Sequence, residues 1–201
     1  GAQMARAETP KRSPTKFDPA DKEMLVSRDR REGLDPQRVM SMVPIQYHQI
    51  VADIGCGPGY FAVPLGKYLF QGKVFALDVQ EEMLEATKEG LERIHLTNVE
   101  VLLSEEKKFP IQDDQLDGAF AAFVVHEAED SNGMMSELER CVRAGGWLAL
   151  LEWHKREMDA GPLLEDRIEE ADLLEMAQLA GFRLERRHSL NSEQYMLVMR
   201  R

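Results

Sequence analysis

Apolar and polar residues alternate in blocks along this chain, and the length of each block predicts a strand or a helix. Five short apolar runs have the length of buried strands. They are residues 49–54, 73–78, 99–103, 116–120 or slightly beyond, and 147–152. The segments 59–69, 81–94 and 131–142 instead repeat apolar residues at helical spacing. Strands alternating with helices in this way are typical of an α/β fold with a parallel sheet.

The C-terminal part of the pattern departs from this alternation. Residues 169–180 have helical spacing and are followed by Gly181, the residue favoured where a helix ends in the left-handed region. Residues 182–188 and 194–199 then alternate like the two strands of a hairpin. We therefore expect a doubly wound, Rossmann-like sheet of seven strands, mostly parallel, with an antiparallel C-terminal strand.

Three glycines follow the first predicted strand at alternate positions, Gly55, Gly57 and Gly59. Glycine reaches positive φ readily, and without a Cβ it lets a ligand lie against the backbone. The helix behind the turn offers unpaired N–H groups at its start. The sequence therefore predicts a cofactor-binding turn between strand and helix.

Two acids stand beside this turn. Asp53 precedes the last residue of the first strand, and Asp78 ends the second. The spacing from Gly59 to Asp78 accommodates one helix and a return to the neighbouring strand. A carboxylate at that place can accept hydrogen bonds from both hydroxyls of a ribose. The turn and the two acids thus indicate a nucleoside site.

The stretch Asp53–Gly59 resembles the first motif of the class I S-adenosylmethionine-dependent methyltransferases. The similarity extends over about residues 35–201, because Asp117–His126 resembles the fourth motif of this family and Arg143–Trp147 resembles the turn into its fifth strand. The resemblance implies the family's fold, its S-adenosylmethionine cofactor and its methyl-transfer activity.

The resemblance also implies roles for individual residues. Asp53 and the three glycines would hold the methionine part of the cofactor, while Tyr60 either covers that part or packs its own helix. Asp78 would bind the ribose and Met83 would contact the adenine. Glu105 would accept a bond from the adenine amino group, at a place where the family usually has Gly-Asp. The implied cofactor-binding residues are Asp53, Gly55, Gly57, Gly59, Tyr60, Asp78, Met83, Glu105 and Ala121.

A dinucleotide is the competing cofactor. Its fingerprint is G-x-G-x-x-G, whereas here the third glycine comes one residue early. Asp53 would also place a negative charge near a pyrophosphate and repel it, but that charge suits the amino group and sulfonium of S-adenosylmethionine. The sequence favours the sulfonium cofactor.

Methyl transfer from a sulfonium requires an aligned acceptor and little water, and it requires a base only if the acceptor must lose a proton. The reacting end of an open α/β sheet lies at the carboxyl ends of its strands, where residues 121–127 and 152–155 are expected. His126 and His154 are the candidate catalytic bases, because imidazole titrates near neutral pH. The plainer alternatives are a hydrogen-bonded structural histidine for His126 and a solvent-facing loop residue for His154.

Two segments outside the sheet are expected to frame the acceptor pocket. The first comprises N-terminal helices within residues 17–48, one of them starting at Asp35 and Pro36, a favoured N-cap and first helical residue. The second, residues 152–162, is polar, and its Gly-Pro turn suits either a lid hinge or a plain surface connection. Residues 17–201 are thus expected to form a single methyltransferase domain.

Residues 1–16 are basic and poor in apolar side chains, which predicts a disordered tail, and residues 1–3 resemble a cloning remnant. Neither a secretory leader nor a membrane-spanning apolar run is visible, so a cytoplasmic setting is expected. Cys56 and Cys141 lack the spacing of a metal site or a disulfide framework. No metal and no membrane partner are therefore expected.

The formal net charge is −11, which repels a phosphate backbone and argues against nucleic acid as a substrate. The predicted function is methyl transfer from S-adenosylmethionine to a small-molecule acceptor by in-line displacement. The alternative is a non-catalytic protein of the methyltransferase fold that binds the adenosyl cofactor or a protein partner. The sequence selects neither the acceptor nor an oligomeric state.

Overall fold

The computed structural model describes residues 34–201 of the chain. The predicted tail at residues 1–16 and the first part of the segment 17–48, in which N-terminal helices were predicted, lie outside this range. Among the described residues, no helix combines the length and the apolar character that a bilayer crossing requires.

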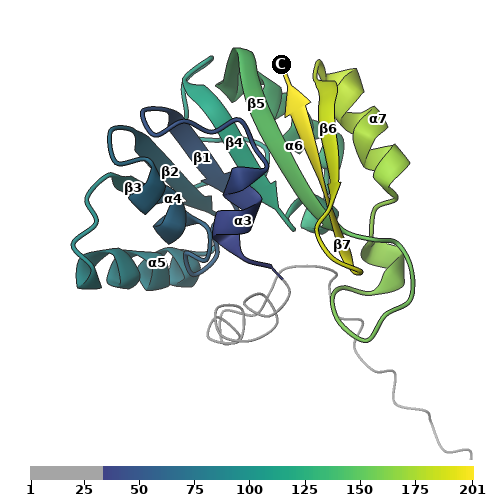
Figure 1. Ribbon diagram of the computed structural model, residues 1–201, viewed down its shortest axis with the longest axis horizontal. Helices are drawn as coiled ribbons and strands as arrows, with labels where there is room; N and C mark the ends of the chain where they lie inside the picture. Colours follow the sequence, from purple (N-terminus) through teal and green to yellow (C-terminus); the bar gives the residue numbers. More distant parts are fainter. Residues whose placement is uncertain (1–33) are drawn as a thin grey trace, which may run out of the picture.

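The core of the protein is one sheet of seven strands in the order β3-β2-β1-β4-β5-β7-β6 (Figure 1). All neighbours are parallel except β7, which runs antiparallel to both β5 and β6. The strands are β1 (Ile50–Ile54), β2 (Lys73–Asp78), β3 (Val99–Leu103), β4 (Leu116–Ala122), β5 (Val142–Trp153), β6 (Arg183–Ser189) and β7 (Gln194–Arg200). The expected doubly wound sheet with an antiparallel C-terminal strand is confirmed.

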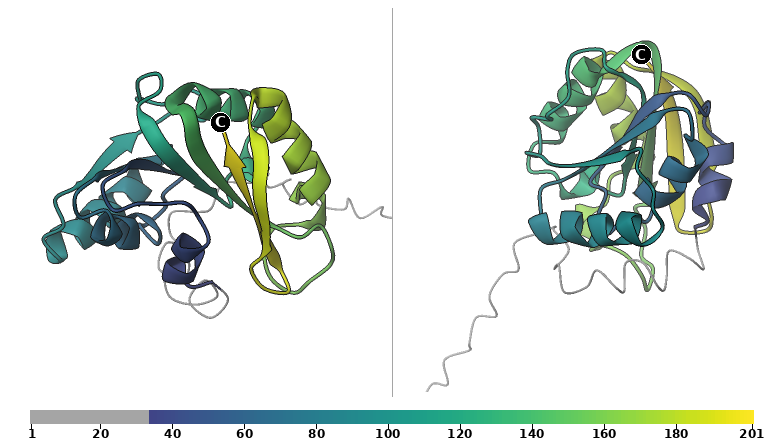
Figure 2. Two further views of the ribbon diagram at one scale, coloured as in Figure 1. Left: turned by 45° about the horizontal axis from the view of Figure 1, so that its top comes forward. Right: turned by 90° about the vertical axis from the view of Figure 1, so that its left-hand side faces the viewer.

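Helices cover both faces of the sheet, as Figures 1 and 2 show. The helices are α3 (Pro36–Ser41), α4 (Ala62–Tyr68), α5 (Glu81–Arg93), α6 (Ser131–Cys141) and α7 (Glu170–Ala180), with short 3₁₀ turns η2 (Val125–Glu127) and η3 (Leu164–Asp166). Apolar side chains of α6 and α7 pack into one core cluster, and those of α3 and α4 into a second cluster on the other face. The central strands are therefore apolar on both faces, as their continuous hydrophobic runs predicted.

The helix boundaries follow the local chemistry of the sequence. Asp35 caps α3, because its carboxylate accepts a hydrogen bond of 3.0 Å from the backbone N–H of Gln37. Gly181 ends α7 with φ of 114°, as predicted. The helix α4 begins at Ala62 rather than at residue 59, where Gly59 has a φ of 98° that is incompatible with a right-handed helix.

The strand β5 is longer than its sequence predicted. It starts at Val142, directly after α6, and continues through Gly145, where φ is 78°. The pairing of β4 with β5 is shifted at this point, between Leu116 and Gly118. Residues 143–145 of this strand are exposed, so the first part of β5 has no apolar run. The sequence pattern therefore could not predict where β5 starts.

Gly118 and Trp147 face each other on β4 and β5. Trp147 is fully buried, and its indole N–H donates a hydrogen bond of 3.2 Å to the side-chain oxygen of Gln49. A Cβ on Gly118 would lie 2.0 Å from the indole ring. The glycine therefore leaves the space that the largest side chain of this face occupies.

Candidate functional site

The glycine turn lies between β1 and α4, at the carboxyl ends of the parallel strands. Its three glycines all have positive φ: 68° at Gly55, 53° at Gly57 and 98° at Gly59. The hydroxyl of Thr87, on α5, donates a hydrogen bond of 2.8 Å to the carbonyl of Gly57. The neighbouring helix thus holds the turn in a backbone conformation that residues with a Cβ rarely adopt.

Asp78 ties the turn to the end of β2. One oxygen of its buried carboxylate accepts a 2.9 Å hydrogen bond from the N–H of Gly57, and the other accepts one of 2.9 Å from the N–H of Gln80. Two backbone donors stabilise the charged form of a carboxylate. The side chain is therefore fixed at the edge of the turn.

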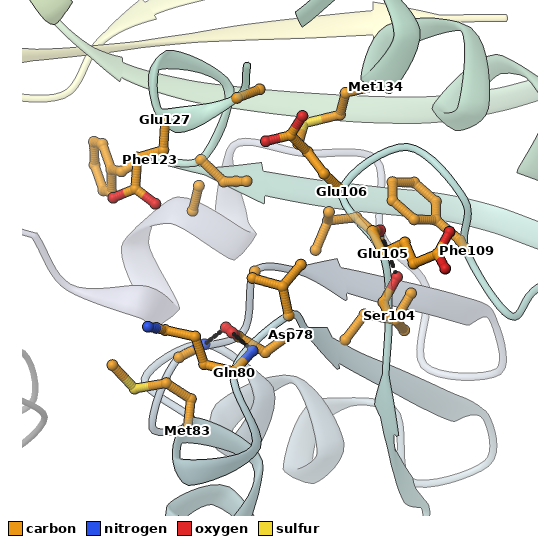
Figure 3. A pocket seen from close by; sticks show the side chains of 18 of the residues that line it. Asp78, Gln80, Met83, Ser104, Glu105, Glu106, Phe109, Phe123, Glu127 and Met134 are labelled. Atoms are coloured by element: carbon orange, nitrogen blue, oxygen red, sulfur yellow. Dashed lines mark hydrogen bonds between the residues drawn. The ribbon is translucent and has the colours of Figure 1, made fainter. Parts of the chain in front are cut away.

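A pocket opens beside this turn (Figure 3). The carboxyl ends of β1, β2, β3 and β4 supply its walls, together with Met134 of α6. The charged members of its lining are Asp78, Glu105, Glu106 and Glu127. Among the described residues, no lysine, arginine or histidine contributes to this lining. The pocket is consequently apolar with an excess of negative charge.

Five of the nine cofactor-binding residues expected from the sequence line this pocket. They are Gly55, Gly57, Asp78, Met83 and Glu105. Figure 3 shows Met83 and Asp78 on one side of the pocket and Glu105 on another. The structure thus brings together residues that are far apart in the sequence. They include Glu105, which with Ser104 stands where the family usually has Gly-Asp.

The other four expected residues, Asp53, Gly59, Tyr60 and Ala121, lie outside the lining. Asp53 and Ala121 are buried within β1 and β4. A Cβ on Gly59 would lie 3.4 Å from Thr87, so this glycine allows close packing of the turn on α5. The hydroxyl of Tyr60 donates to the carbonyl of Leu34, which attaches the turn to the segment before α3.

Cys56 lies within the turn and is buried. Burial raises the pKa of its thiol well above the usual value, and the charges of Asp53 and Asp78 raise it further. The thiol is therefore neutral at physiological pH, and the side chain behaves as a small apolar group of the core.

His126 is buried in η2, with 4% of its side chain exposed. Its Nδ1 lies 2.8 Å from Oε2 of Glu152, and its backbone N–H donates a 3.0 Å hydrogen bond to Oε1 of the same carboxylate. Burial acts to lower the pKa of His126, but the charge and hydrogen bond of Glu152 outweigh it and, with Glu127 and Asp166, raise the pKa above its usual value. His126 is not part of the pocket lining, whereas the next residue, Glu127, is.

His154 lies further from the pocket, at the end of β5. Its ring packs against Tyr195 with 5.2 Å between the centroids, and it does not contribute to the lining. Burial and the positive charge of Arg156 lower the pKa of its imidazole. His154 is therefore half-buried against a tyrosine rather than solvent-facing, and its role as a base stays a prediction.

Phe123, in the segment 121–127 that was expected at the reacting end of the sheet, forms a wall of the pocket. Its φ is 59°, which is strained for an aromatic residue, and a backbone hydrogen bond of 2.9 Å from its N–H to the carbonyl of Leu151 holds it there. Its ring packs against Trp153 at 5.8 Å between centroids. A left-handed phenylalanine has no signal in the sequence, so only the structure could place this ring.

The segment after β5 is ordered around Arg167. This buried guanidinium donates hydrogen bonds to the carbonyls of Pro162, Ala160, Arg156 and His154, at distances of 2.9, 2.9, 2.6 and 3.4 Å. It also lies 5.9 Å from the centre of the Trp153 ring. Residues 154–167 therefore form a loop held by one central side chain, and none of them lines the pocket.

Comparison with known proteins agrees with this geometry. Residues 52–150 match the model of a methyltransferase domain. A crystal structure of an S-adenosylmethionine-dependent methyltransferase from Aquifex aeolicus is 34% identical, with a TM-score of 0.87, and the alignment covers 92% of this chain and 99% of that one. The [4+2]-cyclase SpnF has the same fold, with a TM-score of 0.74 at 16% identity over 82% of this chain and 78% of its own.

Curated relatives include a demethylmenaquinone methyltransferase from Bacillus cereus, 29% identical over 117 residues. The match covers 58% of this chain and 49% of the relative, so the chain spans about half the length of the curated relatives it matches. A doubly wound sheet with a glycine turn at the end of β1 defines a nucleoside-binding α/β protein. Within that class, the chain belongs to the class I S-adenosylmethionine-dependent methyltransferases.

The pocket fits the cofactor of this family. A Cβ on Gly57 would meet no atom within 4 Å, so the backbone of the turn is open to a ligand. Carboxylates are the only charged side chains of the lining among residues 34–201, and they suit a ligand that carries an ammonium and a sulfonium. They would repel a pyrophosphate, which disfavours the dinucleotide. The cofactor of the chain is S-adenosylmethionine.

Proposed function

We propose that this methyltransferase acts on a small-molecule acceptor and that its pocket holds both reactants. The observation that carries the proposal is the lining of the pocket, which combines apolar walls with carboxylates and has no basic side chain among the described residues. Such a lining suits a small organic molecule and repels a phosphate backbone. The formal net charge of −11 acts in the same direction.

In the proposed binding mode, different residues of the chain contact different parts of the cofactor. Asp78 would accept hydrogen bonds from the ribose, while the open backbone at Gly55 and Gly57 would receive the methionine part of the cofactor. Met83 and Glu105 would contact the adenine. The buried Asp53 would add negative charge behind the turn, and Gly59, Tyr60 and Ala121 would support the site from behind.

The cofactor supplies a methyl group on a sulfonium, which is transferred by displacement. The chain itself aligns the acceptor and excludes water. Phe123, supported by Trp153, would form the apolar wall on the acceptor side, because it lies across the pocket from Gln80 and Met83 (Figure 3). Its strained backbone is held by a hydrogen bond, so the wall is in place before the acceptor binds.

The similarity to a demethylmenaquinone methyltransferase suggests the first acceptor to test, demethylmenaquinone. Thiols, phenols and amines form the rest of the panel. The alternative function is a non-catalytic protein of this fold that binds the adenosyl cofactor or a protein partner. SpnF, whose name describes a cyclase, shares the fold alone and does not decide between the two functions. An assay of turnover separates the two functions.

Titration calorimetry with S-adenosylmethionine, S-adenosylhomocysteine and NAD tests the cofactor site first. We expect both adenosyl ligands to bind and NAD to show no heat; binding of NAD alone would overturn the proposal. Transfer of labelled methyl groups to the acceptor panel, with RNA and DNA as comparison substrates, tests the acceptor class. Preferential methylation of nucleic acid would contradict a small-molecule acceptor.

A further inference from the structure

The four carboxylates of the pocket lining have different surroundings. Asp78 accepts from the backbone of the glycine turn. Glu106 accepts from the backbone N–H groups of Glu129 and Asp130, at 3.0 and 3.3 Å. Glu105 is exposed. Glu127 differs from all three because an imidazole lies beside it, with Nε2 of His126 at 3.9 Å from its Oε1.

The imidazole is fixed from its other side. Glu152 is fully buried on β5 and contacts both the ring and the backbone of His126, at 2.8 Å from Nδ1 and 3.0 Å from the backbone nitrogen. With Nδ1 committed to this carboxylate, Nε2 is the ring nitrogen that faces Glu127. The result is a chain of carboxylate, imidazole and carboxylate that leads from the core to the pocket.

Glu127 is the pocket end of this chain. Only 19% of its side chain is exposed, and Figure 3 shows it beside Phe123, on the side of the pocket across from Gln80 and Met83. This is the side on which the proposed function places the acceptor. A carboxylate here can reach a bound molecule, whereas the buried His126 can act only through it.

We infer that Glu127 is the catalytic base of the methyl transfer, that His126 and Glu152 are its positioning residues, and that the acceptor is a molecule whose nucleophilic atom carries a proton. The inference rests on the proposed function and narrows its acceptor class to protic nucleophiles. The nucleophilic atom bonds to the methyl carbon while the carbon–sulfur bond breaks and leaves its electron pair on sulfur. The proton of the acceptor passes to a carboxylate oxygen of Glu127 and then to solvent.

The imidazole of His126 stands between the carboxylates of Glu152 and Glu127. Like charges within a pocket disfavour ionised carboxylates, and three other carboxylates share the lining with Glu127. A protonated imidazole beside Glu127 would oppose this repulsion and favour the ionised carboxylate. The charged groups that act on His126 are Glu152, Glu127 and Asp166, so its protonation depends on all three.

The first test uses the apoprotein and needs no acceptor. The imidazole of His126 is titrated by NMR, with its signal assigned by its loss in His126→Gln. Glu127→Gln and Glu152→Gln should each lower the pKa of His126, because each removes a negative charge that favours the imidazolium. Glu129→Gln, an exposed acid two residues from Glu127, is the matched control and should leave the titration unchanged. An unchanged titration in Glu127→Gln would overturn the inference.

The second test measures turnover with the acceptor found in the panel. A general base typically contributes about 10²–10⁴-fold, so Glu127→Gln should lower kcat by about 100-fold or more, and Glu127→Asp should recover part of it. Binding of S-adenosylhomocysteine, measured by calorimetry, should change little. Turnover of Glu127→Gln equal to that of the wild type would remove Glu127 as the base, while leaving the proposed methyl transfer intact.

Discussion

The carboxylate of Asp78 accepts a hydrogen bond of 2.9 Å from the backbone N–H of Gly57, which joins the end of β2 to the centre of the glycine turn. In the proposed binding mode, this one side chain would shape the turn that receives the methionine part of the cofactor and would also accept hydrogen bonds from the ribose. Substitutions here should affect binding far more than substitutions of other acids.

Replacement of Asp78 by alanine should lower the affinity for S-adenosylhomocysteine by at least about tenfold. A hydrogen bond to a charged group contributes about 1.5–3 kcal/mol, and about 1.4 kcal/mol is a factor of ten. Calorimetric titration measures the loss. Asp113→Ala is the control, because Asp113 is exposed, pairs with Arg140 and is outside the lining. Unchanged affinity in Asp78→Ala would reject the ribose assignment.

Gly57 and Gly90 form a matched pair for the turn, since a Cβ would meet no neighbour within 4 Å at either position. Gly57 has a φ of 53°, so Gly57→Ala should destabilise the fold by about 1–2 kcal/mol and lower the affinity for the cofactor. Gly90 lies inside α5, so Gly90→Ala should stabilise it by about 0.5–1 kcal/mol. Urea unfolding measures both; equal effects would show that backbone conformation is not the cause.

Arg167→Met should loosen the loop of residues 154–167. The variant keeps an apolar side chain of similar length but removes every hydrogen bond to the four carbonyl groups. Hydrogen exchange should become faster in this loop and remain slow in β4 and β7. Arg183→Met, at an exposed position of β6, is the control. Exchange that stays slow in the loop of Arg167→Met would show that other contacts hold it.

The stability of the protein should depend on the charge of His126. Because its folded pKa is raised, folding favours the protonated ring, and this contribution is fully present below the unfolded pKa of about 6.5. It is lost as the pH rises through the higher folded pKa. Urea unfolding between pH 6 and pH 9 should therefore show a larger loss of stability for the wild type than for His126→Gln. Parallel curves would contradict the raised pKa.

Much of the fold could be predicted from local patterns. The strands β2 and β3 have the bounds that their apolar runs indicated, and Asp35 and Gly181 mark helix ends through backbone preferences of single residues. These signals are local, since a strand or a cap depends on a few neighbouring residues. The glycine turn was predicted for the same reason.

The candidate site was less predictable because it depends on contacts between distant parts of the chain. The sequence pointed to His126 but gave no sign of Glu152 as its partner, 26 residues away on another strand. The pairing exists because β4 and β5 are neighbours in the sheet and both end near the pocket. The carbonyl partners of Arg167 could not be predicted either, because the path of the loop determines them and no regular spacing in the sequence does.

The contact between Gly118 and Trp147 constrains how this fold can vary. A side chain at position 118 would occupy the volume of the indole ring, since its Cβ alone would come within 2.0 Å. The two positions can therefore change only together, the second becoming smaller as the first becomes larger. Related chains should show this covariation on the face of the sheet away from α6, independently of the acceptor that each one methylates.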